Sequence, residues 1–249
     1  MNGHVETDFK PAGYAVDDGR PIRVLIIGAG LSGIALYIRL LQHVPAAQIT
    51  IIEKNPQAGG TWYENRYPGV ACDIPSHVYQ YSFEPNTQWS KLFASGQEIL
   101  KYVQGVAHKY GVDKKIKYNT RATKAEWNEN TNTWTVDTES TKLDGTNDVG
   151  SVESEVVISA VGILNNWKWP DIEGLHDFQG KLLHSANWDT SWWVIIPLRN
   201  IWNYAYFLIG TMKARLLHSS AAALLQSKSF PTSRRNAHGS STSFEVELG

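Results

Sequence analysis

The sequence of 249 residues has a single cysteine, Cys72, so no disulfide can form within the chain. It also lacks an excess of either charge, since 23 basic residues stand against 24 acidic ones and the formal net charge is −1. This balance gives no electrostatic footprint for nucleic acid or for an anionic membrane, so we expect neither as a partner. A lone cysteine fits a reducing compartment.

Long uninterrupted apolar runs are lacking as well. Residues 1–20 form a polar arm with four acidic side chains, and no apolar segment follows a basic start, so no secretory signal is expected. The stretch 194–212 is apolar, but Arg199, Asn200 and Asn203 interrupt it and make it a poor membrane span. We therefore expect a cytoplasmic protein, and no residue pattern indicates a metal site.

A strand–helix–strand pattern is present between residues 22 and 53. Residues 22–27 are mostly β-branched and apolar and are followed by a glycine, which predicts a buried parallel strand. Apolar residues recur at helical spacing over 31–43, and residues 49–52 predict a second buried strand that ends at Glu53. The order predicts a βαβ unit with a right-handed crossover.

The next region predicts a long loop followed by a helix. Residues 55–86 are rich in glycine, proline and aromatic residues and show no period. A loop of this length in a compact domain is usually functional or disordered, and its aromatic content argues against disorder. Ser95 and Glu98 have capping-box spacing, so a helix is predicted from there to about Tyr110.

Short strands are predicted beyond this helix. Residues 121–128 and 133–138 are joined by a turn-prone tetrapeptide and predict an antiparallel meander, preceded by a short strand at 116–119. Residues 152–161 predict one apolar strand that ends at Gly162. The fold class is therefore α/β, with a parallel sheet and an antiparallel β-meander in a Rossmann-like, three-layer arrangement.

The glycine motif between the first strand and the helix carries the clearest chemistry. Gly28, Gly30 and Gly33 form a GxGxxG loop, in which the glycines permit the tight turn, the approach of a pyrophosphate and the packing of the helix on the strand. Glu53 stands twenty residues beyond Gly33, where a carboxylate can accept ribose hydroxyls. It would repel a 2′-phosphate, so NADP is disfavoured at this site, whereas NAD and FAD both remain.

The loop that follows resembles a known enzyme family. Residues 59–73, which read GGTWYENRYPGVACD, resemble the loop after the second strand of class B flavoprotein monooxygenases, especially Baeyer–Villiger monooxygenases. The resemblance continues through 79–83, 132–136 and 159–162. Residues 178–189 fit the fingerprint FxGxxxHxxxW(P/D) with Phe178, Gly180, His184, Trp188 and Asp189.

The resemblance implies an activity and two cofactors. In such enzymes NADPH reduces FAD, and the reduced flavin uses O₂ to convert a ketone into an ester or lactone, here in secondary metabolism. The resemblance also implies that Asp73 is the active-site residue. Asp73 would position an arginine that stabilises the negatively charged adduct of reduced flavin and O₂. His184 and Trp188 are interpreted as structural. The residues implied to bind the cofactors are Gly28, Gly30, Gly33, Glu53, Gly60, Thr61, Trp62, Tyr63, Glu64, Ala71, Cys72, Asp73, Tyr79, Ala122 and Gly162.

The resemblance ends at about Thr190. We predict a polar arm at 1–20, an incomplete FAD-binding domain at 21–190 and a divergent tail at 191–249. No second glycine loop for NADPH follows, because only Gly210, Gly239 and Gly249 lie beyond Ser191. Two alternatives to a Baeyer–Villiger enzyme therefore stay open, namely a truncated, non-catalytic FAD-binding fragment and a flavin monooxygenase that oxygenates nitrogen or sulfur.

Overall fold

The computed structural model describes residues 21–141 and 145–191. These residues divide into two compact units, one built from residues up to 56 together with 107–160, the other from 57–106 together with the residues after 160. The predicted polar arm, the apolar stretch 194–212 and almost all of the predicted tail lie outside the described residues. The predicted boundaries of the FAD-binding domain stay a prediction.

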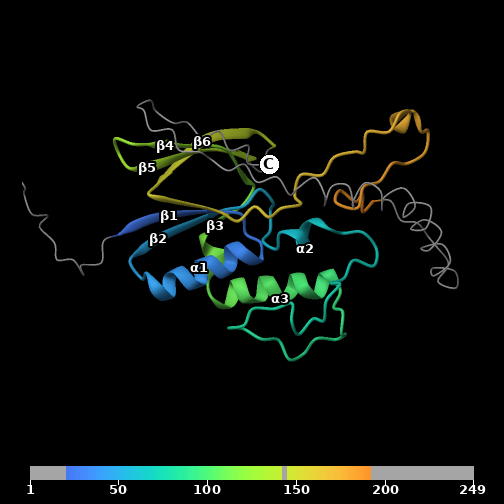
Figure 1. Cartoon of the computed structure of the whole chain (residues 1–249), viewed down its shortest axis with the longest axis horizontal. Coiled ribbons are helices and arrows are strands. Elements are labelled where there is room, and N and C mark those ends of the chain that lie inside the picture. The colour runs from blue at the N-terminus through green and yellow to red at the C-terminus, as the bar shows by residue number, and fades with distance from the viewer. Residues whose placement is uncertain (1–20, 142–144, 192–249) are drawn as a thin grey trace, which may run out of the picture. The chain divides into compact units, whose positions relative to one another are not determined.

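The first unit is organised around a parallel sheet with the strand order β3–β2–β1–β7 (Figure 1). Strand β1 (Ile22–Ile27) pairs along its full length with β2 (Ala47–Ile52) and on its other side with β7 (Val156–Ser159). The short β3 (Ile116–Lys117) adds to the outer edge of β2 and follows the 3₁₀ turn η1 (Val112–Lys115). Because β1 lies between two neighbours, its last four residues are buried, as the apolar run predicts.

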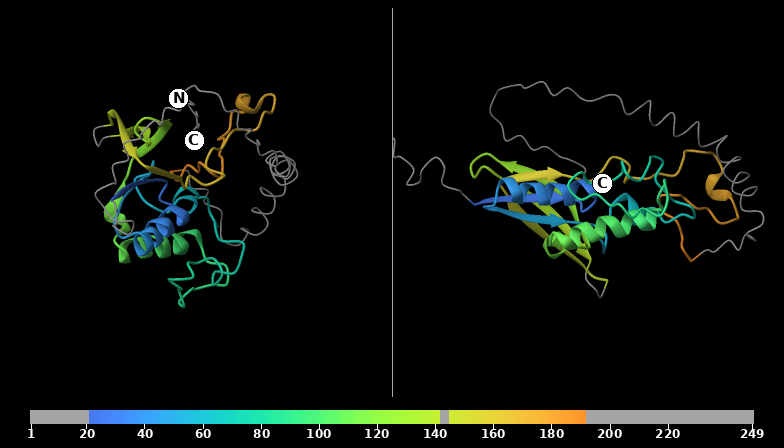
Figure 2. Two further views of the ribbon diagram at one scale, coloured as in Figure 1. Left: turned by 60° about the vertical axis from the view of Figure 1, so that its left-hand side comes forward. Right: turned by 90° about the horizontal axis from the view of Figure 1, so that it is seen from below.

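Helix α1 (Leu31–His43) connects β1 to β2. It has the predicted bounds, and Ile34, Tyr37 and Ile38 are buried on one stripe of it. Figures 1 and 2 show α1 on one face of the parallel sheet and an antiparallel sheet on the opposite face, which confirms the predicted three-layer α/β arrangement.

The antiparallel sheet has three strands rather than the predicted two. They are β4 (Thr120–Asn128), β5 (Thr133–Thr141) and β6 (Asn147–Ser154), in that order. Asn132 has a φ of 52° in the turn between β4 and β5, a left-handed conformation that asparagine tolerates well.

The second unit contains fewer regular elements. Helix α2 (Thr61–Glu64) is a single turn, α3 (Gly96–Lys109) is a four-turn helix whose last residues count with the first unit, and η2 (Leu175–Asp177) is a 3₁₀ turn. Helix α3 begins where the capping box predicts it, and the Ser95 Oγ accepts the Glu98 N–H at 3.3 Å. The Glu98 carboxylate does not complete the box, because it accepts hydrogen bonds from the N–H and the hydroxyl of Ser90 instead.

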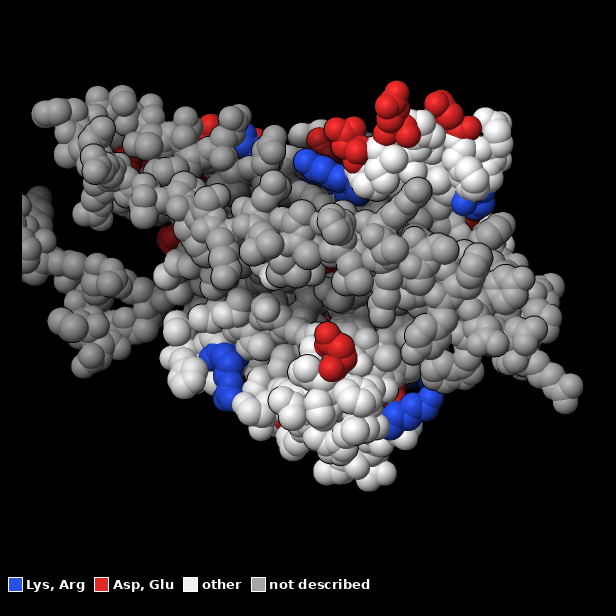
Figure 3. Space-filling view, turned by 45° about the vertical axis from the view of Figure 1, so that its right-hand side comes forward, with Lys and Arg blue, Asp and Glu red and all other residues white. Residues whose placement is uncertain are grey.

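The described residues carry charges of both signs, and none of their helices has the features of a membrane span. Basic and acidic side chains both occur on the face shown in Figure 3, where grey marks residues that are not described. None of the helices within 21–141 and 145–191 has both the length and the apolar character needed to cross a bilayer. The same residues contain no group of three or more metal-ligating side chains.

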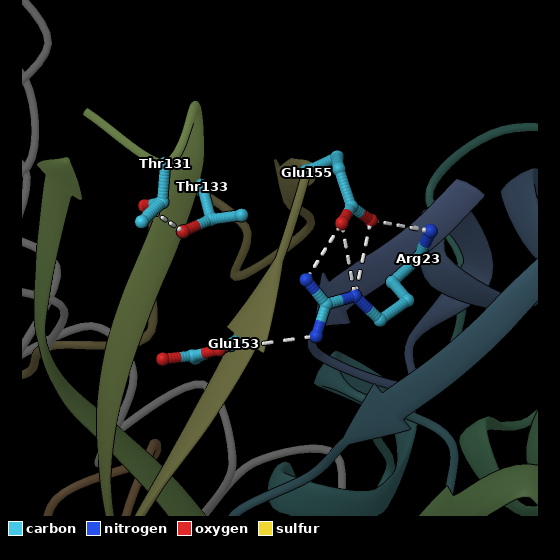
Figure 4. A network of polar contacts seen from close by, with 5 residues as sticks. All are labelled: Arg23, Thr131, Thr133, Glu153 and Glu155. Atoms are coloured by element: carbon cyan, nitrogen blue, oxygen red, sulfur yellow. Dashed lines mark hydrogen bonds and ion pairs between the residues drawn. The ribbon is translucent and has the colours of Figure 1, made fainter. Parts of the chain in front are cut away.

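The predicted single strand at 152–161 is wrong, because the chain changes sheets at Glu155. Residues up to Ser154 belong to β6 in the antiparallel sheet, and Val156 starts β7 in the parallel sheet. Figure 4 shows the reason, since the Glu155 carboxylate accepts hydrogen bonds from the backbone N–H of Arg23 at 2.7 Å and from its guanidinium at 2.6 Å. The sequence of residues 152–161 shows no break. The hydrogen bonds between Glu155 and Arg23 of β1 nevertheless place a bend between the two halves of this segment.

Candidate functional site: a glycine loop and an aromatic loop

The glycine loop of the first unit joins β1 to α1. Gly28 has a φ of 105°, which favours glycine, and its N–H donates to the Ile52 carbonyl at 2.8 Å. A Cβ on Gly33 would lie 1.9 Å from the Gly28 carbonyl oxygen, so only glycine permits this contact between helix and loop. Gly30 has φ −81° and ψ −167°, which any residue can adopt. The backbone conformation at position 30 therefore does not require glycine. Close approach of a ligand to the backbone would require it, because any side chain would stand in the way.

The N-terminus of α1 suits an anion. Gly30 is its N-cap residue, and within the described part of the chain no side chain caps this end by a hydrogen bond. The first turn itself holds no acidic residue, so the positive end of the helix dipole favours an anionic ligand there. A helix N-terminus behind a glycine loop is the arrangement that binds a pyrophosphate.

Glu53 lies immediately beyond the end of β2 and is only 5% exposed. Its Oε2 accepts the Ala29 N–H at 2.7 Å, and its Oε1 accepts the Asn55 N–H at 2.9 Å. A carboxylate has about four acceptor positions, so two remain for hydroxyl donors such as those of a ribose. Sequence reasoning gave Glu53 only the ribose role and missed its contact with the glycine loop, because no pattern shows that a carboxylate 24 positions away reaches Ala29.

Ala122 is linked to the same region through the start of β4. The Thr120 N–H donates to the Glu53 carbonyl at 2.9 Å, and Ala122 follows two residues later with 4% exposure. A β-bulge lies between Ala122 and Lys124, so the pairing with β5 is interrupted next to Ala122. The first unit thus brings together the glycine loop, Glu53 and the strand that carries Ala122.

The other predicted residues lie in the second unit, around α2. Gly59 and Gly60 have φ values of 141° and 53°, and this glycine pair turns the chain into α2. A Cβ on Gly59 would lie 2.3 Å from the Leu100 side chain, so the turn also depends on close packing against α3. Thr61, Trp62, Tyr63 and Glu64 form α2 itself, a helix that the sequence did not predict because a single turn has no readable period.

Trp62 and Tyr79 form the main polar contact of this region. The Trp62 Nε1–H donates to the Tyr79 hydroxyl at 3.1 Å, and the two rings meet edge to face at 5.3 Å and 88°. Burial raises the pKa of Tyr79, so its hydroxyl stays protonated up to high pH.

Asp73, the residue predicted to act in catalysis, is exposed between the buried Cys72 and the exposed Ile74. Among the described residues no donor or cation contacts its carboxylate. Arg66 is the arginine nearest in sequence, but its Nε donates to the Tyr63 carbonyl and its guanidinium stacks 4.4 Å from the centre of the Tyr63 ring. The proposed role of Asp73 in orienting an arginine therefore stays a prediction.

Ala71 and Cys72 are fixed by the backbone of the opposing segment. Ala71 forms an isolated β-bridge with Ser95, and the Cys72 N–H donates to the Ala94 carbonyl at 3.1 Å. Gly162 lies apart from these contacts in the chain, with a φ of 79° and open space where a Cβ would stand. Its conformation favours glycine without any packing reason.

The fingerprint segment forms a closed turn around His184. The His184 Nδ1 accepts the Ala186 N–H at 3.1 Å, and the ring stacks on Trp167 at 4.7 Å. Burial lowers the pKa of His184, which favours the neutral ring that this hydrogen bond requires. An ion pair of 2.6 Å between Lys181 and Asp189 spans the same turn and lowers the pKa of Asp189 to about 2.

Comparisons with known proteins agree with this arrangement. A family model described as an NAD(P)-binding Rossmann-like domain matches residues 26–95. The chain is 48% identical over 172 residues to the FAD-binding monooxygenase tazF of Aspergillus terreus, a match that covers 68% of this chain and 30% of that protein. It is 35% identical over 168 residues to a Baeyer-Villiger monooxygenase of Streptomyces coelicolor, covering 68% of this chain and 30% of the relative.

Among solved structures, a variant of cyclohexanone monooxygenase from Rhodococcus sp. Phi1 bound to NADP+ has a TM-score of 0.60 and 30% identity. The match covers 69% of this chain and 32% of that one. The chain thus spans about 30% of the length of the curated relatives that it matches. Over the matched two thirds of its own length, the chain belongs to the family of FAD-binding monooxygenases that includes the Baeyer–Villiger enzymes.

Proposed function

We propose that this chain provides the FAD-binding part of a monooxygenase that uses NADPH and O₂ to insert one oxygen atom next to a ketone, giving an ester or lactone. The observation that carries the proposal is the glycine loop with the Glu53 carboxylate hydrogen-bonded to its Ala29 N–H. Support comes from relatives whose names state FAD binding and Baeyer–Villiger oxygenation. A ketone of secondary metabolism is the substrate class that we propose at family level.

The residues of the first unit fit the ADP portion of FAD. The N-terminus of α1 would hold the pyrophosphate, and the absence of a side chain on Gly30 would let it approach. The buried Glu53 carboxylate would accept the ribose hydroxyls with the positions that Ala29 and Asn55 leave unused. The backbone of Ala122 would contact the adenine.

The residues of the second unit are proposed for the flavin portion and the nicotinamide. FAD, when bound, supplies the redox chemistry and the activation of O₂. The chain's own residues bind, orient and exclude water: the α2 residues would lie along the flavin, with Ala71, Cys72 and Gly162 as further contacts. Asp73, exposed and without a cation among the described residues, would receive the guanidinium of an arginine and fix its orientation.

A titration with FAD tests the first step of this proposal. The purified 249-residue chain is titrated with FAD and followed by flavin fluorescence, beside a Gly30→Asp variant. We expect saturable binding that Gly30→Asp weakens about 100-fold or more, because a carboxylate would stand against the pyrophosphate at close range. A chain that folds and shows no saturable binding would contradict the proposed FAD site.

The activity is tested separately on the flavin-loaded chain. Consumption of NADPH that depends on an added ketone, with formation of an ester or lactone, would support the Baeyer–Villiger reaction. Turnover of amines or thioethers in place of ketones would support the nitrogen- or sulfur-oxygenating alternative. Bound FAD with no oxidation of NADPH would leave this chain as a flavin-binding unit without that activity.

A further inference from the structure

The hydrogen bond between Trp62 and Tyr79 has a consequence for the Tyr79 proton. An indole N–H can only donate, whereas a phenol has one proton to donate and two lone pairs to accept. Because Trp62 donates to the Tyr79 oxygen at 3.1 Å, the Tyr79 proton is directed to a different acceptor. Within residues 21–141 and 145–191, no acceptor receives it.

The Trp62 side chain is itself restrained by packing at the start of α3. Its ring is buried, with 8% exposure. A Cβ on Gly96, the first residue of α3, would stand 2.9 Å from Val70 Cγ1 and 3.4 Å from Trp62 Cε3. The Gly96 N–H also donates to the Val70 carbonyl at 2.8 Å. The start of α3 therefore leaves the indole little freedom, and its N–H direction is fixed before any ligand arrives.

Tyr79 differs from its partner in exposure. It is half-buried, so part of its ring and hydroxyl can face a ligand, while its edge-to-face contact with Trp62 fixes the ring plane. Asp73 lies close enough to act electrostatically on the phenol. The unused proton thus belongs to a hydroxyl of fixed orientation in the region proposed for the flavin.

We propose that Trp62 is a positioning residue that makes Tyr79 a fixed hydrogen-bond donor to an acceptor atom of the isoalloxazine ring of FAD. The inference rests on the proposed function, since it requires that the flavin lies at this loop. The acceptors that isoalloxazine offers are ring nitrogens and carbonyl oxygens, and a donor of fixed direction selects one of them. The phenol stays protonated over the range of ordinary assays, because burial raises its pKa above 10.

A double-mutant cycle on the full 249-residue chain tests this coupling. FAD affinity and the visible absorption spectrum of the bound flavin are measured for Tyr79→Phe, Trp62→Phe and the double variant. We expect each single variant to raise the Kd of FAD about 3- to 10-fold and to shift the spectrum in the same direction. The double variant should behave like Tyr79→Phe alone, because Trp62→Phe keeps an aromatic ring beside the flavin and removes only the N–H that acts through the Tyr79 hydroxyl.

Two further variants separate positioning from general packing. Trp89→Phe removes an indole N–H that donates to Gln80 Oε1 at 3.0 Å in the same unit, and it should leave the flavin spectrum unchanged. Trp62→His retains a ring N–H donor and should keep the spectrum of the unmodified chain. Circular dichroism of every variant establishes that it is folded.

The outcomes distinguish this inference from the proposed function. If the unmodified chain binds no FAD, both are overturned. If it binds FAD but the effects of Tyr79→Phe and Trp62→Phe add up in the double variant, only the coupling is overturned. An unchanged flavin spectrum in Tyr79→Phe would overturn the hydrogen bond to the flavin as well.

Discussion

The β1–α1–β2 unit and the loop at 57–95 are built by different means. In the first, every residue of β1 is in register with one of β2, and the connecting helix has the bounds that its apolar spacing predicts. In the second, α2 is the one helix, so the chain is held mainly by scattered contacts. Backbone ladders distribute stability over many hydrogen bonds, whereas the loop depends on single side chains.

Ser76 and Tyr102 show how the loop depends on single groups. The Ser76 Oγ donates to backbone carbonyl oxygen in the opposing segment, at 2.9 Å from Leu92 O, and accepts the Ala94 N–H at 2.8 Å. The Tyr102 hydroxyl donates to the Glu84 carbonyl at 2.7 Å and accepts the Tyr81 N–H at 2.8 Å. Each of these hydroxyls replaces hydrogen bonds that a strand would have made with a neighbouring strand.

The loop also exposes apolar side chains that the first unit buries. Val78 is 71% exposed and Leu92 is 58% exposed, whereas Leu25 and Ile26 of β1 are fully buried. The loop buries aromatic residues such as Trp62 and Tyr81 but leaves several aliphatic side chains exposed, so it relies on polar contacts more than the first unit does, a balance typical of segments that contact ligands.

The largest effect is expected where backbone packs on backbone, at Gly33. In Gly33→Ala, the new Cβ would stand 1.9 Å from the Gly28 carbonyl oxygen, so α1 must move away from the loop. We expect a loss of about 3 kcal/mol or more in the free energy of unfolding and loss of FAD binding. Urea denaturation followed by circular dichroism measures the first, and flavin fluorescence the second.

Gly105→Ala is the matched control for this substitution. Gly105 lies inside α3, and nothing lies within 4 Å of the position that its Cβ would take. The change should raise the free energy of unfolding by about 0.5–1 kcal/mol, because alanine favours the helix over glycine. Equal destabilisation by both substitutions would show that the close contact at Gly33 is unimportant.

Ser76→Ala tests the loop in the same way. Ser76 is fully buried, and the substitution leaves the Ala94 N–H without its acceptor. We expect about 1–3 kcal/mol of destabilisation, with faster hydrogen exchange confined to the loop amides. Native-state hydrogen exchange followed by mass spectrometry measures both quantities.

Ser82→Ala is the control for that experiment. Ser82 is exposed in the same loop, and no hydrogen bond of its side chain to a described residue is found. Its substitution should change stability by less than about 0.5 kcal/mol. If Ser76→Ala accelerates exchange across β1 and β2 as much as in the loop, the two regions unfold together and the contrast between them is lost.

The difference between the regular β1–α1–β2 unit and the loop at 57–95 also determines how much of the fold can be predicted from the sequence. Strand β1 and helix α1 have the predicted bounds, because a buried parallel strand and an amphipathic helix each leave a period in the sequence. Helix α2 has no such period, and the part of β6 before residue 152 was missed because its side chains are exposed. The change of sheet at Glu155 depends on a contact 132 positions away in the chain, which no local pattern reveals.

The candidate site follows the same rule. The glycine loop and Glu53 are readable because their spacing reflects a backbone geometry that recurs in dinucleotide-binding folds. The bond from Trp62 to Tyr79 is not readable, since both residues lie in a segment without a period and could equally pack without a hydrogen bond. Likewise, the interaction of Arg66 with Tyr63 could not be predicted from the motif that contains both.

The smallest effect is expected for Glu155→Gln, which tests the ion pair that fixes the change of sheet. Arg23 lowers the pKa of the Glu155 carboxyl from 4.5 to about 2, chiefly through the side-chain hydrogen bond. A lowered pKa in the folded chain means that the stabilisation is complete above pH 4.5 and disappears as the pH falls through about 2. Both side chains are partly exposed, with 43% and 36% of their surface accessible, so solvent and salt weaken the pair.

We therefore expect Glu155→Gln to lower Tm by no more than a few degrees above pH 5, and the gap to close as the pH falls toward 2. Thermal unfolding of both chains at several pH values between 2 and 7 measures this gap. Glu129→Gln, in the exposed turn between β4 and β5, should show no such gap at any pH. A gap for Glu155→Gln that persists unchanged at pH 2 would mean that the glutamate acts through packing and not through its charge. The junction between β6 and β7 would then belong with the first unit's regular core, and the dependence on single polar groups would be confined to the loop at 57–95.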